Sequence, residues 1–332
     1  MSIVIDNLKS LSEFIKKYTY DKQSLKFKDP NIILSMDDII FSFNTSSINL
    51  SNRNIDDVNI NTLMALIVNV NNLLTLNLSF NRISDKGVNE ITEKIKTLTS
   101  LDTLVLEGNY IGQESLTNLI INLPNSLTKL YLSFNDIQNE CLIKLTNKLQ
   151  SLNKLTHLHL ANTNIGINKN KMELLIKTLP KSLIDLNLAD NNIGPDGVSV
   201  IATKLQTLPS LNSLNLSNNN IGPDSIINLI SNLSTSLRRL FLSGNNLGNT
   251  DFEILVDKLP NFNSLTDLYL GYNDINTQVL YPLMINLPTS LIRLDLSSCN
   301  IDKKGAAKLA TRLTDLTVLE SLSLTDNNIR SR

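Results

Sequence analysis

The sequence has few cysteines, almost no net charge and no long apolar run. Its two cysteines, Cys141 and Cys299, fall in separate repeats of the pattern described below, so we expect no disulfide. The formal net charge is −1, whereas a general nucleic-acid binder needs a basic face. No stretch reaches the roughly 20 apolar residues of a membrane span, and the N-terminus has no signal-peptide core. We therefore expect a cytoplasmic protein with no nucleic-acid partner and no membrane span.

Recognisable catalytic motifs are missing as well. The sequence has no G-x-S-x-G motif, no phosphate-binding loop and no pair of carboxylates that its pattern would place in one pocket. Cys141 is expected in an outer helix and Cys299 in a turn, which are poor positions for a nucleophile. We expect neither an enzyme nor a cofactor.

What the sequence does contain is one motif, repeated along the chain. Its clearest copy is LIDLNLADNNI, from Leu183 to Ile193, with the spacing L-x-x-L-x-L-x-x-N-x-I/L. Successive copies start 26 or 28 residues apart, and a fixed period in this range is typical of a solenoid. The eleven copies begin at Thr45, Leu73, Leu101, Leu127, Leu155, Leu183, Leu211, Leu237, Leu265, Leu291 and Leu319.

The spacing within each copy predicts its local structure. Alternating leucines such as Leu186 and Leu188 are typical of a strand with one buried face. The asparagine that follows, here Asn191, is expected at a turn, where its amide can donate to and accept from backbone groups of neighbouring coils. Stacked copies would then share an asparagine ladder. Three copies have another residue at this position, namely Arg53, Thr163 and Cys299.

Between the copies, a second period indicates a helix. After the copy at Leu183, an apolar stripe is expected on one helical side, and Pro195 suits the first turn. Strands stack about 4.8 Å apart, whereas packed helices need about 8–10 Å. We therefore predict an α/β horseshoe with a concave parallel β-sheet and convex helices. The stripe consists of Val198, Ile201, Ala202, Leu205 and Leu208.

This pattern resembles the ribonuclease-inhibitor-like class of leucine-rich repeat (LRR) proteins, from Thr45 to the C-terminus. The resemblance implies an LRR solenoid of about eleven repeats of 26–28 residues. The class includes inhibitors, receptors, actin-binding caps and GTPase activators, so the fold alone does not define a function. An activator of the Ran type is one alternative that the resemblance implies, with Arg82 as its candidate polar residue; the acidic C-terminal tail usual in that family is absent.

The two ends of the chain differ from the repeat. Residues 1–44 do not match it and are rich in aromatic side chains, so we expect an N-terminal cap over the first coil, with residues 45–332 forming the solenoid. A membrane-surface helix is the alternative for this segment, because lysines are frequent in it. The last copy ends at Ile329 and no C-terminal cap is visible. We expect either that the chain continues, or that this edge meets a partner or a second copy.

The candidate binding residues follow from the register of the repeat. The third, fifth and seventh residues of each copy point away from the leucines, and the eighth and tenth lie on the rim. Exposed aromatics beside arginines are the usual composition of binding hot spots; the alternative is that they only shield neighbouring coils. One group contains Phe80, Tyr110, Tyr131 and Phe134, with His157 and His159 beside it. The other contains Phe241, Tyr269 and Tyr272, flanked by Arg238, Arg239, Asp267, Arg293 and Asp295.

Both histidines of the chain fall on one strand. His157 and His159 are expected about 6–7 Å apart on the same face, with Lys129 and Asp185 flanking His157 on the adjacent strands. A metal site needs a third ligand, and no cysteine or glutamate is placed to supply one. We therefore expect no metal here. Two interpretations of these histidines remain, namely a plain contact surface and a contact whose strength depends on pH.

The function favoured by these observations is a non-catalytic scaffold that binds a partner protein on the concave face. Asn, Ile, Lys, Leu and Ser dominate the composition, while the repeat is of a eukaryotic style. Together these features resemble the LRR effectors that intracellular bacteria such as Legionella deliver into the host cytosol, which implies a host protein as partner. The alternative source is a cytosolic LRR scaffold of a protist with A/T-rich codons.

Overall fold

The structure is a computed structural model that describes residues 46–67, 72–137, 139–167, 169–222, 225–275 and 277–329. The expected N-terminal cap, residues 1–44, lies outside these ranges. The chain forms two compact units that divide between Leu158 and His159, here called unit 1 and unit 2.

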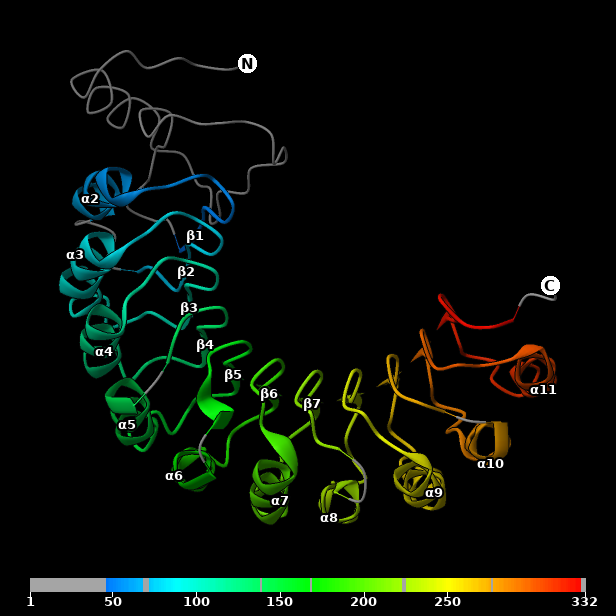
Figure 1. Ribbon diagram of the computed structural model, residues 1–332. Coiled ribbons are helices and arrows are strands. Elements are labelled where there is room, and N and C mark those ends of the chain that lie inside the picture. Colours follow the sequence, from blue (N-terminus) through cyan, green and yellow to red (C-terminus); the bar gives the residue numbers. More distant parts are fainter. Residues whose placement is uncertain are drawn as a thin grey trace, which may run out of the picture. The chain divides into compact units, whose positions relative to one another are not determined.

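The repeated motif forms the strands of one parallel sheet, as the leucine spacing predicted. Strands follow one another in the sheet in chain order (Figure 1). Equivalent leucines pair, for example Leu186 with Leu214. The strands are β1 (Ser47–Asn49), β2 (Thr75–Asn77), β3 (Thr103–Val105), β4 (Lys129–Tyr131), β5 (His157–His159), β6 (Asp185–Asn187), β7 (Ser213–Asn215), β8 (Arg239–Phe241), β9 (Asp267–Tyr269), β10 (Arg293–Asp295) and β11 (Ser321–Ser323).

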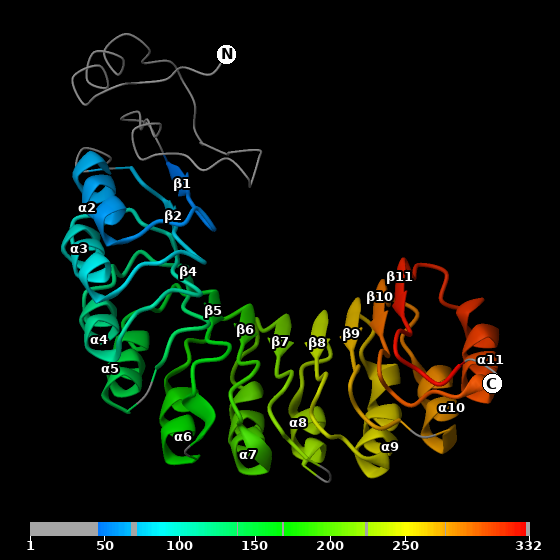
Figure 2. The same cartoon turned by 45° about the horizontal axis from the view of Figure 1, so that its top comes forward.

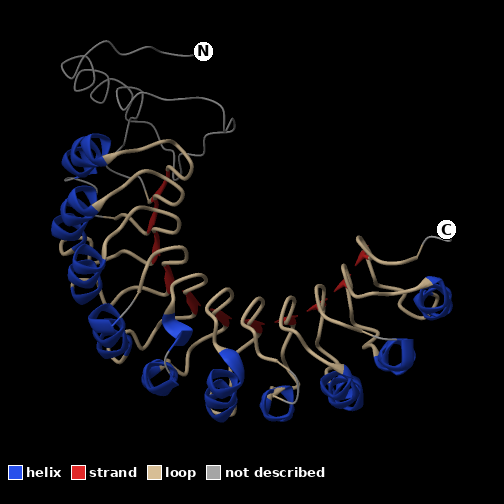
Figure 3. Cartoon of the chain, viewed as in Figure 1, coloured by secondary structure: helices blue, strands red, loops and turns tan. Residues whose placement is uncertain are grey.

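A helix follows each strand except β11 within the described residues, so the strand–helix unit predicted for each repeat is confirmed. Within each unit the helices lie on one side of the sheet, and the strands and the loops that follow them form the other side (Figure 3). We call these sides the helix face and the strand face. The helices are α2 (Asp57–Leu66), α3 (Asp85–Ile95), α4 (Gln113–Ile121), α5 (Asn139–Leu149), α6 (Lys169–Thr178), α7 (Gly194–Leu205), α8 (Ile226–Asn232), α9 (Asn249–Lys258), α10 (Thr277–Asn286) and α11 (Lys303–Leu313).

The core lies between the sheet and the helices. Leu183, Leu186 and Leu188 of the clearest copy are fully buried, and Pro195 occupies the first turn of α7 as expected. Burial of each large aliphatic side chain contributes about 1.5–3 kcal/mol, so the repeated leucines supply the main stabilising term. The predicted stripe of α7 is also buried throughout, at Val198, Ile201, Ala202, Leu205 and Leu208.

The asparagine ladder connects successive coils as predicted. Asn191 is 1% exposed, and its Nδ2 donates to the carbonyl oxygens of Leu160, Leu188 and Ala189 at 2.7, 3.1 and 3.0 Å. Its Oδ1 accepts from the backbone N–H of Thr163 at 2.9 Å, in the preceding repeat. Because a buried backbone group without a partner costs about 1–3 kcal/mol, each such asparagine stabilises two repeats at once.

Two of the three departures from asparagine keep part of this network. The hydroxyl of Thr163 donates to the carbonyl of Leu160 at 2.7 Å. The Cys299 thiol lies 3.4 Å from the carbonyl oxygen of Leu270, and both side chains are fully buried. Arg53, in the first repeat, is half-buried, and its backbone N–H donates to Asn81 Oδ1 at 2.9 Å. A small polar side chain can therefore replace asparagine, but it satisfies fewer carbonyls.

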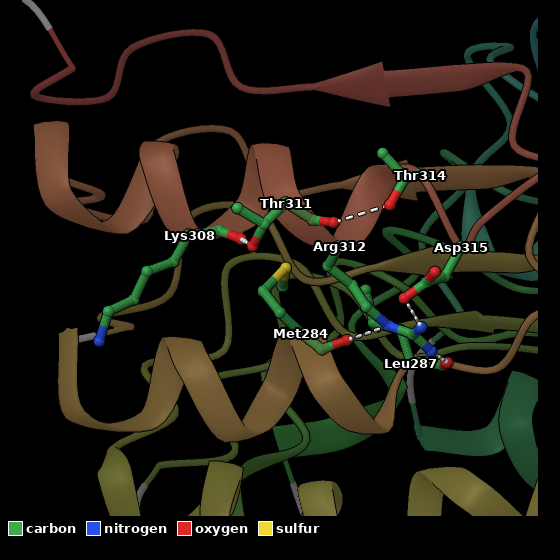
Figure 4. Close-up of polar contacts among 7 residues, drawn as sticks. All are labelled: Met284, Leu287, Lys308, Thr311, Arg312, Thr314 and Asp315. Carbon is green, nitrogen blue, oxygen red and sulfur yellow. Dashed lines mark hydrogen bonds and ion pairs between the residues drawn. The ribbon is translucent and has the colours of Figure 1, made fainter.

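Helix ends on the helix face are connected by long basic side chains. Arg312 of α11 donates from Nε to the Met284 carbonyl at 3.0 Å and from Nη2 to the Leu287 carbonyl at 3.3 Å, at the end of α10 (Figure 4). Its Nη1 also pairs with Asp315 at 2.6 Å. The last carbonyls of a helix have no partner within that helix, so Arg312 caps α10 from the next repeat.

Candidate partner-binding face

The strand face presents the third and fifth residues of most repeats, as the register predicted. The seventh residue was predicted there too, but it is buried in several repeats, as at Ser79, Ser133 and Ala189, because it lies at the turn into the core. Strand β4 is labelled in Figure 2. Its central Leu130 is fully buried, while Lys129 and Tyr131 on either side of it are only half-buried. The alternation of side chains along a strand accounts for this difference. Both groups of predicted site residues therefore lie on the strand face or its rim, one group mainly in unit 1 and the other in unit 2.

The group in unit 2 is centred on two stacked rings. Phe241 on β8 and Tyr269 on β9 are paired residues of adjacent strands, and their ring centroids are 4.6 Å apart with an interplanar angle of 22°. Tyr272, on the rim of the same repeat as Tyr269, is 63% exposed. Rings held in this way offer a large contact area with little conformational entropy left to lose.

An ion pair between strands that are not neighbours borders this stack. Arg239 Nη2 lies 3.0 Å from Asp185 Oδ2, although β7 separates their strands β8 and β6. The intervening residue of β7 is Ser213, which pairs in register with both and is buried. The guanidinium can reach across because a serine leaves room for it, and less than half of its side chain is exposed to solvent.

A second arginine is held in a similar way. Arg293 Nη1 lies 2.8 Å from Asp267 Oδ1, and Asp267 also accepts from the Thr266 hydroxyl at 2.6 Å. The hydrogen bond and the charge of Asp267 raise the pKa of Arg293. Asp267 itself is only 6% exposed. Of the predicted contact residues, Asp267 is therefore placed to orient Arg293 rather than to present its own surface.

Asp185 connects Arg239 to one of the histidines. His159 Nε2 lies 3.5 Å from Asp185 Oδ1. Burial raises the pKa of Asp185, but the neighbouring His159, Arg239 and Ser213 side chains outweigh it and hold that pKa below its ordinary value. The sequence predicted that Asp185 lies on the strand next to His157, and it did not predict the contact with His159. The Nδ1 atom of the His157 ring lies 2.8 Å from the Thr156 hydroxyl.

The group in unit 1 lies mainly on the rim. Phe80 and Phe134 have ring centroids 6.2 Å apart, tilted by 52°. Between their repeats is Gly108, where an added Cβ would come within 2.5 Å of the Phe80 ring. The missing side chain at Gly108 thus lets the two rings approach. Tyr110 nearby in the sequence is 72% exposed, and Tyr131 is half-buried on β4.

Three of these aromatics have a backbone conformation that sequence reasoning missed. Phe80, Phe134 and Tyr272 have φ values of +54°, +59° and +56°. Bulky residues rarely adopt this left-handed conformation, and holding one there costs about 1–3 kcal/mol. The sequence does indicate a left-handed conformation at the eighth position of the repeat. That position holds asparagine, aspartate, glycine or serine in the other repeats, as at Asn162, Asp190, Asn218 and Gly244.

Both cysteines of the chain are buried and free. Among the residues that the structure describes, no three His, Cys, Asp or Glu side chains come together as a metal site would require. Burial raises the pKa of both cysteine thiols, Cys141 and Cys299, to about 11, so they are protonated and unreactive at neutral pH. Within the described ranges, none of the helices has the length and apolarity needed to cross a membrane.

Comparison with known proteins agrees with the fold. Five segments match a family model described as Leucine Rich repeat, at residues 70–91, 124–145, 180–202, 207–229 and 288–310. No protein with a curated description matches the sequence. The chain therefore contains leucine-rich repeats, and its fold is an LRR solenoid.

Several solved structures are similar to this chain. The LRR-containing protein LegL7 from Legionella pneumophila is 20% identical, with a TM-score of 0.50 over 82% of this chain and 90% of that one. An internalin (inlF) from Listeria monocytogenes is 20% identical, with a TM-score of 0.49 over 87% and 76% of the two chains. The functional domain of InlJ, also from Listeria monocytogenes, is 19% identical, with a TM-score of 0.48 over 85% and 53%. At these identities the similarity concerns the fold alone.

Proposed function

We propose that this protein is a non-catalytic scaffold that binds a partner protein on its strand face, through the aromatic and arginine cluster of unit 2. LRR proteins generally mediate protein–protein interaction, and solenoids use their inner surfaces for it. The central residues of the proposed site are Arg239, Phe241, Tyr269, Tyr272 and Arg293. Within the LRR proteins, we assign the chain to the ribonuclease-inhibitor-like class because every described strand except β11 is followed by a helix.

The observation that carries this proposal is the way in which the two arginines are held. Each guanidinium has five N–H donors, and each makes one ion-pair contact, with Asp185 or with Asp267. The carboxylates fix the orientation of the guanidinium groups while leaving further donors for a partner. The stack of Phe241 and Tyr269 supplies rigid apolar area on the neighbouring strands. Aromatic and arginine side chains that are fixed before binding lose little entropy when a partner docks.

Strain in the rim supports the same function. Tyr272 adopts a left-handed conformation that asparagine or glycine would adopt at lower cost, and it is mostly exposed. Folding alone gives no reason for an exposed tyrosine there, since its ring buries little area. A contact with a partner does give a reason, because the ring would be buried on binding. Phe80 and Phe134 in unit 1 follow the same logic, with Tyr110, Tyr131, His157 and His159 as further proposed contacts.

The test is a capture experiment from eukaryotic cytosol with three immobilised proteins. The first is the wild type, the second carries Tyr269→Ala and Tyr272→Ala, and the third carries Tyr281→Ala. Tyr281 is a matched control because it is a part-exposed tyrosine on α10, on the helix face. A protein captured by the wild type and by the control, but not by the double variant, supports the proposal. Equal capture by all three moves the binding site away from this cluster.

We further propose that the partner is a host protein and that the chain is an effector delivered by an intracellular bacterium. The support is compositional, from the abundance of Asn, Ile, Lys, Leu and Ser in a eukaryotic-style repeat. A cytosolic scaffold of a protist remains the alternative source. A translocation reporter fused to the chain and expressed in Legionella should give signal inside infected cells. No signal above that of a secretion-deficient strain would contradict the effector role.

A further inference from the structure

The helix face of unit 2 contains a groove between α6 and α7. Its volume is about 560 Å³, which is in the range of small-molecule sites. Ile176 and Val200 give it an apolar part, and Ser199, Thr203 and Thr207 add hydroxyl groups. Its charged lining residues are Lys169, Glu173, Lys177, Lys181, Asp196 and Lys204.

The lysines of this groove outnumber its carboxylates. Both carboxylates already have partners, since Glu173 lies 2.5 Å from Lys177 Nζ and Asp196 lies 3.5 Å from Lys169 Nζ. Neither ion pair involves Lys181 or Lys204. The groove therefore has an excess of positive charge, in a chain whose net charge is −1.

The excess is concentrated at one end. Helix α6 ends at Thr178 and α7 at Leu205, so Lys177, Lys181 and Lys204 all lie near the C-terminal ends of the two helices. Lys204 Nζ donates to the carbonyl of Lys177 at 3.2 Å. Burial lowers the pKa of Lys204, and the positive charge of Lys181 lowers it further. Both ammonium groups line the same groove, and the charge of each disfavours the charged form of the other.

Helix capping explains only part of this arrangement. A lysine in the last turn stabilises a helix through its dipole, and this accounts for Lys177 and for Lys204, as it does for Lys148 in α5. Lys181 lies after the end of α6, outside its last turn. Its positive charge opposes that of Lys204. An anion held between Lys181 and Lys204 would remove that repulsion, because an opposite charge within a few ångströms favours the charged form of each lysine.

We propose that the groove between α6 and α7 binds a ligand with more than one phosphate group. Lys177, Lys181 and Lys204 would hold the phosphates, since each ammonium has three donors and lysine binds phosphate as a point charge. The hydroxyls of Thr203 and Thr207 already donate to the carbonyls of Val200 and Lys204, so the lysines supply the donors. Ile176 and Val200 line the apolar part, which would face the remainder of the ligand. Two sources share this chemistry, namely a soluble nucleoside polyphosphate and the headgroup of a phosphorylated lipid.

The experiment is titration calorimetry of the full chain with ATP and with inositol 1,4,5-trisphosphate. Saturable binding of either probe with one site per chain is expected, and Lys181→Glu should weaken it at least tenfold. Lys258→Glu is the matched control, because it makes the same charge change at an exposed lysine of α9 outside the groove. Thermal melts of both variants check the fold. No saturable binding of either probe, or equal weakening by the two variants, would overturn the proposal.

Vesicles separate the two sources of the phosphates. Sedimentation with vesicles that contain phosphatidylinositol 4,5-bisphosphate, compared with vesicles of phosphatidylcholine alone, tests the lipid headgroup. Selective sedimentation that Lys181→Glu abolishes assigns the ligand to a lipid, whereas ATP binding without sedimentation assigns it to a soluble polyphosphate. The variant with Tyr269→Ala and Tyr272→Ala should bind these probes like the wild type, because the groove lies on the opposite side of the repeats from the strand face.

Discussion

The guanidinium of Arg239 reaches across β7 to the carboxylate of Asp185, 3.0 Å away, over the small side chain of Ser213. Three repeats therefore contribute one residue each to a single electrostatic contact. Such a contact depends on the order and register of the strands, and it fixes the position of an arginine that would otherwise sample many rotamers. Mutations on the strand face should accordingly separate effects on binding from effects on folding.

The ion pair makes stability depend on pH on the acid side. The pKa of Asp185 in the folded protein lies below its ordinary value of 3.8. A carboxyl group with a lowered pKa stabilises the fold above its unfolded pKa, and this contribution is lost as pH falls through the folded pKa. Replacing Asp185 with Asn should therefore reduce the loss of melting temperature between about pH 5 and pH 2.5 relative to the wild type. Parallel melting curves over this range would contradict the assignment.

Tyr272→Asn should stabilise the fold while weakening partner binding. Asparagine adopts positive φ at lower cost than tyrosine, and the mostly exposed ring contributes little burial. We expect the free energy of unfolding to rise by about 1 kcal/mol, measured by urea denaturation. Tyr272→Val is the control at the same position, because a β-branched residue should be strained there and lower the stability. A destabilised Tyr272→Asn would mean that the ring is needed for folding.

Asn191→Ala should be among the most destabilising single changes. It would leave buried backbone groups of two repeats without partners, including the carbonyl of Leu160 and the N–H of Thr163. We expect a loss of about 3 kcal/mol or more, measured by chemical denaturation. Asn187→Ala is a suitable control, since the half-buried Asn187 side chain accepts one hydrogen bond, from the backbone N–H of Ala189 at 3.1 Å. Similar losses for the two variants would argue against the ladder as the source of stability.

Arg312→Ala should weaken the last helices more than Arg312→Lys. The alanine variant loses the hydrogen bonds to the carbonyls of Met284 and Leu287, whereas lysine can still donate to one of them. We expect a loss of about 1–2 kcal/mol for alanine and a smaller one for lysine. Hydrogen exchange should show faster opening at the end of α10 in the alanine variant. Unchanged exchange there would show that solvent caps the helix equally well.

The sequence by itself determined the repeating architecture. Alternating leucines such as Leu186 and Leu188 can bury one face only as a strand, and the following apolar stripe from Val198 to Leu208 can bury one side only as a helix. The asparagine ladder followed from the same spacing, because a side chain that both donates and accepts is required at a buried turn. These interactions are local or repeat at a fixed period, so a single sequence is enough to predict them.

Only the tertiary structure decided how side chains of different repeats combine. The contact of Asp185 with His159, the reach of Arg239 across Ser213, and the burial of Asp267 beneath Arg293 depend on rotamers and distances between strands. The lysine-rich groove between α6 and α7 depends on how two helices pack. A period in the sequence specifies which residues share a face. Which of them touch is decided by side-chain length and by competition for the same partner, and that competition is resolved only when the coils are stacked.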